Sequence, residues 1–444
     1  TALTATLSSY GTTTIVAAAG DTDILVNIMN ITGGAGDDTL TGDGVSNANI
    51  LDGGAGDDTL IGLYGDDTLI GGAGNDAVSW AYRNSAMTLT LDRAGTVSFG
   101  TGGGDDDRMV GIENAIGGTG ADRIVGDSGT NVLNGNGAND TLSGRGGNDT
   151  LLGDAGLDTA DFFYLSTALS ATLDSAATAT IVAGDGDTDV LSGIENISGG
   201  AGDDTLWGDG VANVISGAGG NDTLRGLGGV DTLYGGTGVD AADFRYASTG
   251  VTATLTATGV AVVSAGDTDT LFEIENILAG SGNDTLVGNS SANLLDGAAG
   301  NDTLRGEAGN DTLAAGDGLD TASYAYLSTG FTATLLAAGT ATVTAAAGDT
   351  DILTGIENIL GSTLADRLVG DDGANTIDGN GGGDLLSGRG GNDFLRGGAG
   401  GTGTVDYSYI STALTATLSS YGTTTIVAAA PPRRKSLPPR PDNR

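Results

Sequence analysis

A nine-residue pattern constrains this chain more than any other feature. In residues 53–79, GGAGDDTLIGLYGDDTLIGGAGNDAVS, glycines, then an acidic residue and then an apolar residue return every nine positions. Rows of this kind follow one another in groups of five, for example GGAGDDTLW, GDGVANVIS, GAGGNDTLR, GLGGVDTLY and GGTGVDAAD at 199–243. Self-similarity at so short a period predicts a repeat architecture, not a set of ordinary globular domains.

A longer period encloses the rows. The phrase DxLxGIENI returns as DILVNIMNI from Asp23, DRMVGIENA from Asp107, DVLSGIENI from Asp189, DTLFEIENI from Asp269 and DILTGIENI from Asp351. The chain is therefore predicted to contain five modules, at 1–83, 84–165, 166–246, 247–327 and 328–410. A partial sixth module (411–430) and a basic, Pro-rich tail (431–444) follow, and residues 412–430 repeat residues 1–19.

Each row reads as a turn followed by a short strand. In GGAGDDTLI (53–61) the glycines permit the backbone angles of a tight turn. In the strand Thr59, Leu60 and Ile61, alternate side chains face opposite ways, so only Leu60 needs to point inward. Two rows then make one turn of a flattened coil. The predicted fold is all-β, a parallel β-roll or β-helix solenoid whose two thin sheets enclose a layer of Leu, Ile and Val.

Spacers of about 37 residues separate the groups of rows. Each contains a β-like pair, such as STGVTATL and GVAVVSA, and ends in the IENI phrase. This length is close to four rows, so the coil either continues through the spacer or is interrupted there. The sequence leaves both possibilities open.

The acidic residues need counter-ions. The chain has 57 acidic and 16 basic residues, a net charge of -41. One buried Leu contributes about 1.5 to 3 kcal/mol, whereas ordering nine residues costs about 1.5 kcal/mol each. Asp38, Asp58 and Asp76 are predicted to stack at one strand spacing, roughly 4.8 Å. Carboxylate and turn carbonyl oxygens suit Ca²⁺ better than Mg²⁺, so calcium ions are predicted between the rows.

Composition excludes many other chemistries. The chain has no Cys and no His, which excludes disulfides, thiol nucleophiles, Cys/His zinc sites and imidazole bases. Its charge disfavours nucleic acid and anionic membranes, and no apolar run approaches a membrane span. We expect no enzymatic activity: the Glu-Asn pair of the IENI phrase is interpreted as a corner cap, not as a catalytic group. Ordinary strand positions, and not an ice-binding surface, are expected for Thr4, Thr6, Thr252, Thr254, Thr332 and Thr334. Local packing, and not a sugar-stacking platform, is expected for the aromatic residues Trp80, Trp207, Phe162, Phe163 and Tyr164.

A resemblance becomes specific at residues 111–153, GIENAIGGTGADRIVGDSGTNVLNGNGANDTLSGRGGNDTLLG. This segment resembles the RTX nonapeptide family, GGxGxDxUx, including the calcium-binding β-roll of serralysin-type secreted proteins, and the spacers resemble those of long bacterial RTX arrays. The resemblance implies an extracellular location, type I secretion, an unfolded state in low cytosolic calcium, and folding outside the cell. TALTATLSSY lacks the basic flank of a Sec signal, so an export signal is expected to lie elsewhere or to have been trimmed.

The resemblance also implies the ligands. The sixth residue of a row would supply a carboxylate: Asp38, Asp58, Asp67, Asp76, Asp122, Asp140, Asp149, Asp158, Asp204, Asp222, Asp231, Asp240, Asp284, Asp302, Asp311, Asp320, Asp366, Asp384 and Asp393. The second and fourth residues would supply carbonyls, the fourth being Gly36, Gly56, Gly65, Gly74, Gly120, Gly147, Gly156, Gly202, Gly220, Gly229, Gly238, Gly282, Gly300, Gly309, Gly318 and Gly391.

Some rows depart from this pattern. Row two of every group has Asn in place of Asp, which keeps an oxygen but loses the charge, so weaker sites are expected there: Asn49, Asn131, Asn213, Asn293 and Asn375. The last row, 397–405, has Thr402, and its site is expected to be poor. By the family's stacking rule each module would hold about three ions, roughly 15 Ca²⁺ in all.

Three functions are compatible with these features. We expect an extracellular, calcium-stabilised structural protein, such as a filament, surface-layer protein or adhesin stalk, whose subunits associate head to tail. The alternatives are an accessory calcium-folding module of a larger secreted enzyme or toxin, and a calcium buffer. Partners would then be calcium ions and other copies of the chain, without nucleic acid and without a membrane span.

Overall fold

The computed structural model describes residues 2–8, 12–17, 22–92, 96–100, 106–174, 178–184, 186–256, 260–264, 267–336, 340–345, 349–400, 402–411, 414–415 and 427–428. The predicted partial sixth module lies almost wholly outside these residues, and the basic tail 431–444 lies entirely outside them. The chain forms two compact units, Thr1–Thr312 and Leu313–Arg444. Each unit is a stack of short strands, and the described residues contain no helix.

The rows fold as the sequence predicts. In β7 (Thr59–Ile61) Leu60 is fully buried while Thr59 and Ile61 are half-buried. Parallel pairing places Leu40 of β5 (Thr39–Thr41) and Val78 of β9 (Ala77–Ser79) beside Leu60 on one face of the coil. Leu51 of β6 (Ile50–Ala55) pairs with Leu69 of β8 (Thr68–Ala73) on the other face. All of these side chains are buried, so successive rows form a continuous apolar layer between two parallel sheets.

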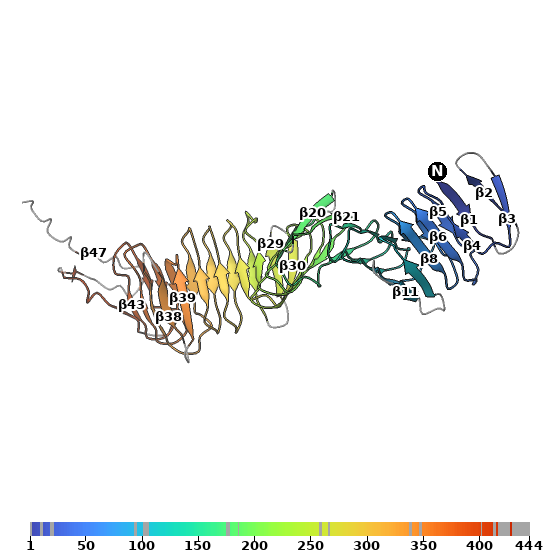
Figure 1. Ribbon diagram of the computed structural model, residues 1–444. Helices are drawn as coiled ribbons and strands as arrows, with labels where there is room; N and C mark the ends of the chain where they lie inside the picture. The colour runs from blue at the N-terminus through green and yellow to red at the C-terminus, as the bar shows by residue number, and fades with distance from the viewer. Residues whose placement is uncertain are drawn as a thin grey trace, which may run out of the picture. The chain divides into compact units, whose positions relative to one another are not determined.

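On the first face of the first unit, the ladder runs from β1 to β33 (Figure 1). Its strands, in order of pairing, are β1 (Leu3–Thr6), β5 (Thr39–Thr41), β7, β9 (Ala77–Ser79), β13 (Asn114–Ile116), β15 (Val132–Asn134), β17 (Thr150–Leu152), β21 (Thr188–Ser192), β20 (Thr178–Ala183), β19 (Leu169–Thr172), β23 (Thr205–Trp207), β25 (Thr223–Arg225), β27 (Ala241–Asp243), β31 (Asn276–Leu278) and β33 (Leu294–Asp296). β2 (Thr12–Ala17) pairs with β1, and β3 (Thr22–Val26) pairs with β2.

The second face of this unit has two ladders. One contains β4 (Asn30–Thr32), β6 (Ile50–Ala55), β8 (Thr68–Ala73), β12 (Asp106–Val110) and β11 (Thr96–Gly100). The other contains β10 (Thr88–Thr90), β14 (Arg123–Val125), β16 (Thr141–Ser143), β18 (Thr159–Asp161), β22 (Asn196–Ser198), β24 (Val214–Gly219), β26 (Thr232–Thr237), β30 (Asp267–Phe272), β29 (Val260–Ser264), β28 (Thr252–Thr254), β32 (Thr285–Val287) and β34 (Thr303–Arg305).

The second unit repeats the arrangement. One face holds β35 (Thr312–Ala314), β39 (Thr350–Thr354), β38 (Ala341–Thr344), β37 (Thr332–Thr334), β41 (Arg367–Val369), β43 (Leu385–Ser387) and β45 (Thr404–Val405). The other face holds β36 (Thr321–Ser323), β40 (Asn358–Leu360), β42 (Thr376–Asp378) and β44 (Phe394–Arg396). A separate pair joins β46 (Leu414–Thr415) to β47 (Val427–Ala428).

The coil continues through the spacers, which answers the question that the sequence left open. In the spacer at 166–198, β19, β20 and β21 form an antiparallel meander. Its last strand, β21, pairs in parallel with β17 of the preceding rows, and its first strand, β19, pairs in parallel with β23 of the following rows. The meander therefore occupies three positions in one ladder and joins two groups of rows without a break.

The aromatic interpretation holds for most of its residues and is wrong for one. Trp80 and Phe162 are fully buried, and the Arg225 guanidinium lies over the Trp207 ring at 4.2 Å. Phe163, however, is 72% exposed. It lies at the turn between β18 and β19. The preceding residue, Phe162, is fully buried, so the ring of Phe163 faces solvent.

The apolar layer makes a direct prediction. Leu133 is buried between Ala115 and Leu151, so Leu133→Ala should leave a cavity and destabilise the calcium-bound protein by about 2–5 kcal/mol. Val132→Ala is the matched control, because Val132 precedes it in β15 and is 41% exposed. Denaturant unfolding in saturating calcium measures both. Equal effects of the two substitutions would contradict the inward direction of Leu133.

Candidate metal centres

The sixth-position side chains form columns along the edges of the coil. The main-chain N–H of Asp38 donates to Oδ1 of Asp58 at 2.7 Å, and the N–H of Asp58 donates to Oδ1 of Asp76 at 2.8 Å. The same step recurs from Asp122 to Asp140 and from Asp204 to Asp222. Each carboxylate thus uses one oxygen to bond the row before it, and the other oxygen decides what else the site can hold.

Burial of these carboxylates is nearly complete. All predicted aspartates except Asp393 are buried, with at most 4% of their surface exposed. Asp393 is half-buried, and Thr402 of the final row, which has no carboxylate, is exposed. The described structure therefore brings 18 of the 19 predicted aspartates into the interior edges of the two stacks. Burying an ionised carboxylate is costly unless it is bonded or bound to a metal.

Row two of every group, and row one of every group except the fourth, have turns closed by their own side chain. In row one, the N–H of the second residue donates to Oδ2 of the sixth: Gly34 to Asp38, Gly118 to Asp122, Gly200 to Asp204 and Ser362 to Asp366. In row two the acceptor is the Oδ1 of Asn49, Asn131, Asn213, Asn293 or Asn375. We call these closed turns.

The asparagines have a second bond that explains their place in row two. Asn131 Nδ2 donates to the carbonyl of Glu113 at 2.7 Å, and Asn213 Nδ2 donates to that of Glu195 at 2.7 Å. The neighbour of row two along the column is thus a main-chain carbonyl of the spacer. An amide can donate to that carbonyl, whereas a carboxylate would repel it.

Rows three to five have a different turn. Their second residue has a positive φ, as in Leu63 (70°), Arg145 (69°) and Gly54 (99°). For residues other than glycine this conformation costs about 1–2 kcal/mol. The Oδ2 atoms of these rows are buried without a hydrogen-bond partner at Asp58, Asp67, Asp76, Asp140, Asp149, Asp158, Asp222, Asp231, Asp240 and Asp384. We call these open turns.

Main-chain oxygens lie close to these unbonded atoms. A Cβ on Gly53 would collide with Asp58 Oδ2 and would lie 2.7 Å from the carbonyl oxygen of Gly71, in the next row on that edge. A Cβ on Gly71 would likewise meet Asp76 Oδ2 at 2.6 Å and collide with the carbonyl of Gly111. The row-opening glycines therefore leave room where a carboxylate oxygen and a carbonyl oxygen face the same small space.

The fourth-position glycines stack directly on one another. A side chain on Gly56 would come within 2.8 Å of the carbonyl oxygen of Gly36, and one on Gly74 would collide with the carbonyl of Gly56. The second-position carbonyls that the resemblance implied already carry bonds in many rows. Gly34 O accepts from Ala55 N–H, and Leu63 O accepts from the Tyr82 hydroxyl. The fourth-position carbonyls thus lie at the row contacts, and the second-position carbonyls share their lone pairs with other donors.

The spacers add carboxylates that the sequence interpretation did not count as site residues. Oδ1 of Asp107, Asp189 and Asp269 accepts the N–H of Asp67, Asp149 and Asp231, in continuation of the row-four column. Oε2 of Glu113, Glu195, Glu275 and Glu357 accepts the N–H of Asp76, Asp158, Asp240 and Asp320. The signal was present in the sequence, because both residues belong to the recurring DxLxGIEN phrase. The Glu does cap a corner, as interpreted, and it does so by ending a carboxylate column.

Burial shifts the titration of the columns. Desolvation raises the pKa of row-three and row-four carboxylates to about 7, at Asp67, Asp140, Asp149, Asp222 and Asp231. It raises the pKa of the row-five carboxylates Asp76, Asp158 and Asp240 to about 6. Neighbouring carboxylates raise these pKa values further, whereas the N–H donors of the preceding row lower them. Without a cation, then, these sites hold their negative charge poorly near neutral pH.

The donor set fits calcium. Among the described residues, no three acidic side chains gather into one metal-binding group, so an ion here has to draw on main-chain oxygens as well. The buried Oδ2 atoms and adjacent carbonyls are hard oxygen ligands, which Ca²⁺ takes in numbers of six to eight. An ion beside Asp58 or Asp76 would give the unbonded oxygen a partner and offset the charge of its neighbours.

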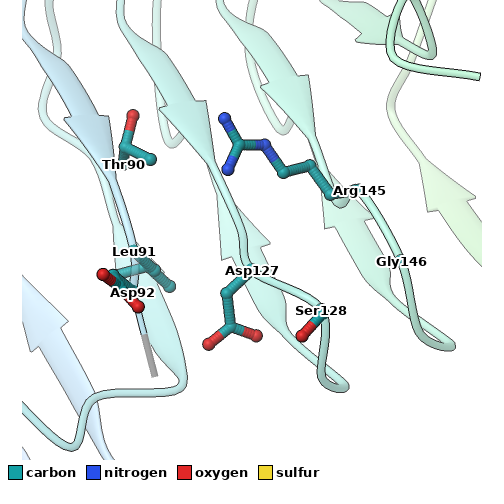
Figure 2. Close-up of a pocket in the computed structure, with 7 residues that line it drawn as sticks. All are labelled: Thr90, Leu91, Asp92, Asp127, Ser128, Arg145 and Gly146. Carbon is teal, nitrogen blue, oxygen red and sulfur yellow. The ribbon is translucent and has the colours of Figure 1, made fainter. Parts of the chain in front are cut away.

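One open depression, of about 440 Å³, lies at an edge of the first unit. It is lined by Thr90, Leu91, Asp92, Asp127, Ser128, Arg145 and Gly146. Figure 2 shows Arg145 extending toward the side of Thr90, while Asp92, Asp127 and Ser128 lie at the turn end. Thr90 ends β10, and Leu91 and Asp92 follow it. The remaining residues lie in the turns of rows two and four, so the depression is a surface formed by stacked turns.

The rows match a known family. The sequence profile described as RTX calcium-binding nonapeptide repeat (4 copies) matches residues 30–44, 43–78, 110–142, 125–160, 189–210, 207–241, 274–304, 287–322 and 360–395, more than half of the chain. The chain belongs to this RTX family. RTX repeats bind Ca²⁺ and are typical of secreted bacterial proteins.

Other comparisons add little. A solved structure similar to this RTX protein is the extracellular lipase LipA from Serratia marcescens, at 18% identity and a TM-score of 0.17. The match covers 55% of this chain and 37% of the lipase chain. No curated protein sequence matches this chain.

The raised pKa values predict how the metal-free protein responds to pH. A carboxyl whose folded pKa lies above its unfolded value near 3.9 favours folding at low pH, and this contribution is lost as pH rises through the folded pKa. Without calcium, the strand signal in far-UV circular dichroism should therefore decrease as pH rises from 5.5 to 8. A strand signal that increases with pH would contradict the prediction.

Proposed function

We propose that this RTX protein is an extracellular, calcium-stabilised structural repeat protein that folds when it meets calcium outside the cell. The observation that carries the proposal is the set of buried carboxylate oxygens without partners in stacked, open turns. Such a stack is disfavoured without cations and stabilised with them. A chain that folds only where calcium is abundant suits a protein that is exported unfolded.

The repeats themselves favour a structural role over catalysis. Row columns and meanders account for nearly all of the described residues, and the chain contains no His or Cys to serve as base or nucleophile. No helix in the described part of the chain is long and apolar enough to cross a membrane. We propose a filament, surface-layer protein or adhesin stalk, reached by type I secretion and built by association of copies of the chain.

Calcium occupancy is proposed among the predicted aspartates, at those with an unbonded buried oxygen, together with main-chain carbonyls. At a calcium concentration ten times above Kd, each independent site stabilises the folded state by about 1.4 kcal/mol. Several sites in one group of rows therefore decide whether that group folds. The alternative role, an accessory folding module of a larger secreted enzyme or toxin, uses the same sites and differs in what the folded chain is attached to.

We predict that chelation unfolds the protein. Addition of EGTA should abolish most of the strand signal in far-UV circular dichroism and enlarge the hydrodynamic radius. Excess calcium should restore both, whereas magnesium at equal concentration should not, because Mg²⁺ requires a smaller octahedral site. A strand signal that survives EGTA unchanged would contradict calcium-dependent folding.

Electron microscopy separates the two roles. In millimolar calcium a filament or lattice protein should form ordered assemblies that disperse in EGTA. A folded but monodisperse chain, together with a longer reading frame that encodes a catalytic domain, would instead favour the accessory module. Calcium titration without any assembly and without such a domain would favour a buffer.

A further inference from the structure

The five rows of a group are not equivalent. In all five groups, the second residue of rows three, four and five has a positive φ, at Gly54, Leu63, Gly72, Asn136, Arg145, Asp154, Ala218, Leu227, Gly236, Ala298, Glu307, Gly316, Asn380, Arg389 and Gly398. The second residue of rows one and two never has one. Because Leu, Arg and Glu take this conformation as well as Gly, the difference is set by the position of the row in its group.

We propose that cations bind only at the open turns of rows three, four and five, and that rows one and two are cation-free turns closed by their own side chains. This rests on the proposed calcium binding and specifies where it occurs. It differs from a uniform arrangement, in which ions would also lie between rows one and three and between rows two and four.

The closed turns already satisfy the groups that a cation would need. Asp122 accepts the N–H of Gly118 at Oδ2 and that of Met87 at Oδ1, so each of its oxygens already accepts a bond. Asn131 accepts the N–H of Asp127 at Oδ1 and donates from Nδ2 to Glu113 O. An N–H hydrogen thus lies where an ion would approach the oxygen of either side chain.

The open turns provide the opposite environment. The main-chain N–H of their second residue makes no hydrogen bond to the sixth side chain, and Oδ2 of Asp58 or Asp140 is left buried without a partner. The carbonyl of the first residue of the next row lies near the same space in both kinds of turn, as Gly71 does for Asp58 and Gly53 does for Asp38, so the two turns differ in the N–H donor and not in the carbonyl. The positive φ of the second residue turns its main-chain N–H away from the sixth side chain. These oxygens therefore face a position that no N–H of their own turn occupies.

Because the open turns belong to the last three rows of a group, the proposed sites lie near the spacer that follows. Along the column, the neighbour of Asp76 in row five is Glu113, and the neighbour of Asp67 in row four is Asp107. Cations beside these two rows therefore lie next to spacer carboxylates. Binding at rows four and five would hold each group of rows to the meander that follows it.

The groups are not all equally regular. Asp284 has the closed backbone, yet its Oδ2 is buried without a hydrogen bond, so the fourth group is unsuitable for a clean comparison. In the fifth group, row five has Thr402 in place of the carboxylate. Rows one and three of the first, second, third and fifth groups offer four matched pairs.

The test compares two fourfold variants of the full chain. One carries Asp38→Asn, Asp122→Asn, Asp204→Asn and Asp366→Asn in closed turns. The other carries Asp58→Asn, Asp140→Asn, Asp222→Asn and Asp384→Asn in open turns. Bound calcium per chain is counted by equilibrium dialysis and metal analysis at saturating calcium. Asn already occupies the closed turns of row two, so the first variant should fold and keep the wild-type number.

The open-turn variant should lose about one ion for each substituted row. Equal losses in the two variants, or a loss only in the closed-turn variant, would overturn the inference. A wild-type chain that binds no calcium would instead overturn the proposed function, so the two failures are distinguishable.

A second set of variants keeps the test valid if the open-turn variant does not fold. Asn131→Asp, Asn213→Asp and Asn375→Asp add carboxylates to row two. In a uniform arrangement they would create additional sites, whereas closed turns predict an unchanged calcium count. Extra bound calcium in this variant would overturn the inference, and an unchanged count would support it.

Discussion

The structure depends on carboxylates that are buried in columns along the edges of the coil. In open turns such as that of Asp58, hydrogen bonds reach only one of the two carboxylate oxygens. Each sixth-position aspartate accepts an N–H from the preceding row at Oδ1, which fixes the stacking of the turns. In open turns such as those of Asp58, Asp140 and Asp222, Oδ2 has no such donor. The same residue thus aligns the coil and carries an unsatisfied charge into its interior. We propose that this combination makes folding near neutral pH dependent on a cation, because the backbone ladder cannot form without burying the carboxylate.

The meanders show how a coil of short rows can be long without becoming uniform. Between two meanders the chain changes face an odd number of times, through one strand after the meander and then five rows. Successive meanders in the first unit therefore lie on opposite faces: β1–β3 on the first, β10–β12 on the second, β19–β21 on the first and β28–β30 on the second. The carboxylate columns change edge with them. Each edge alternates between a long column ending in Glu and a short one beginning with Asn.

The sequence predicted the repeating unit well because the unit is governed by local rules. Strand Leu60 points inward because side chains alternate along a strand, and glycines stack at Gly56 and Gly74 because no larger residue fits against the neighbouring carbonyl. The sixth-position aspartates were recognised for the same reason, as the period repeats them. The prediction of calcium as the ligand agrees with the family to which the chain belongs.

The sequence did not distinguish the two kinds of turn, and the physical reason is clear. Position two of an open turn is Gly54, Leu63 or Arg145, and position two of a closed turn is Gly34, Asp43 or Asp127. No residue type separates these sets, because Gly and Asp occur at this position in both kinds of turn, as Gly54 and Asp154 do in open turns. The continuity of the coil was also undetermined, since it depends on pairing across about 40 residues, as between Asp67 and Asp107. The spacer Glu was recognised as a cap, but its membership in a carboxylate column required the stacked structure.

The apolar layer and the carboxylate columns have complementary roles. The layer contributes one buried side chain per row, such as Leu60 or Leu133, and by itself does not offset the entropy of ordering nine residues. It nevertheless fixes which way each strand faces, and with it the edge to which each aspartate belongs. The columns then make the stability of the stack depend on calcium. Where calcium is scarce, repulsion between the carboxylates and their desolvation oppose stacking. Where calcium is abundant, ions bound by the same carboxylates would stabilise it. In the first, second, third and fifth groups, rows one and two already have the oxygens of their sixth side chains bonded, so these turns need no cation to complete their hydrogen bonds.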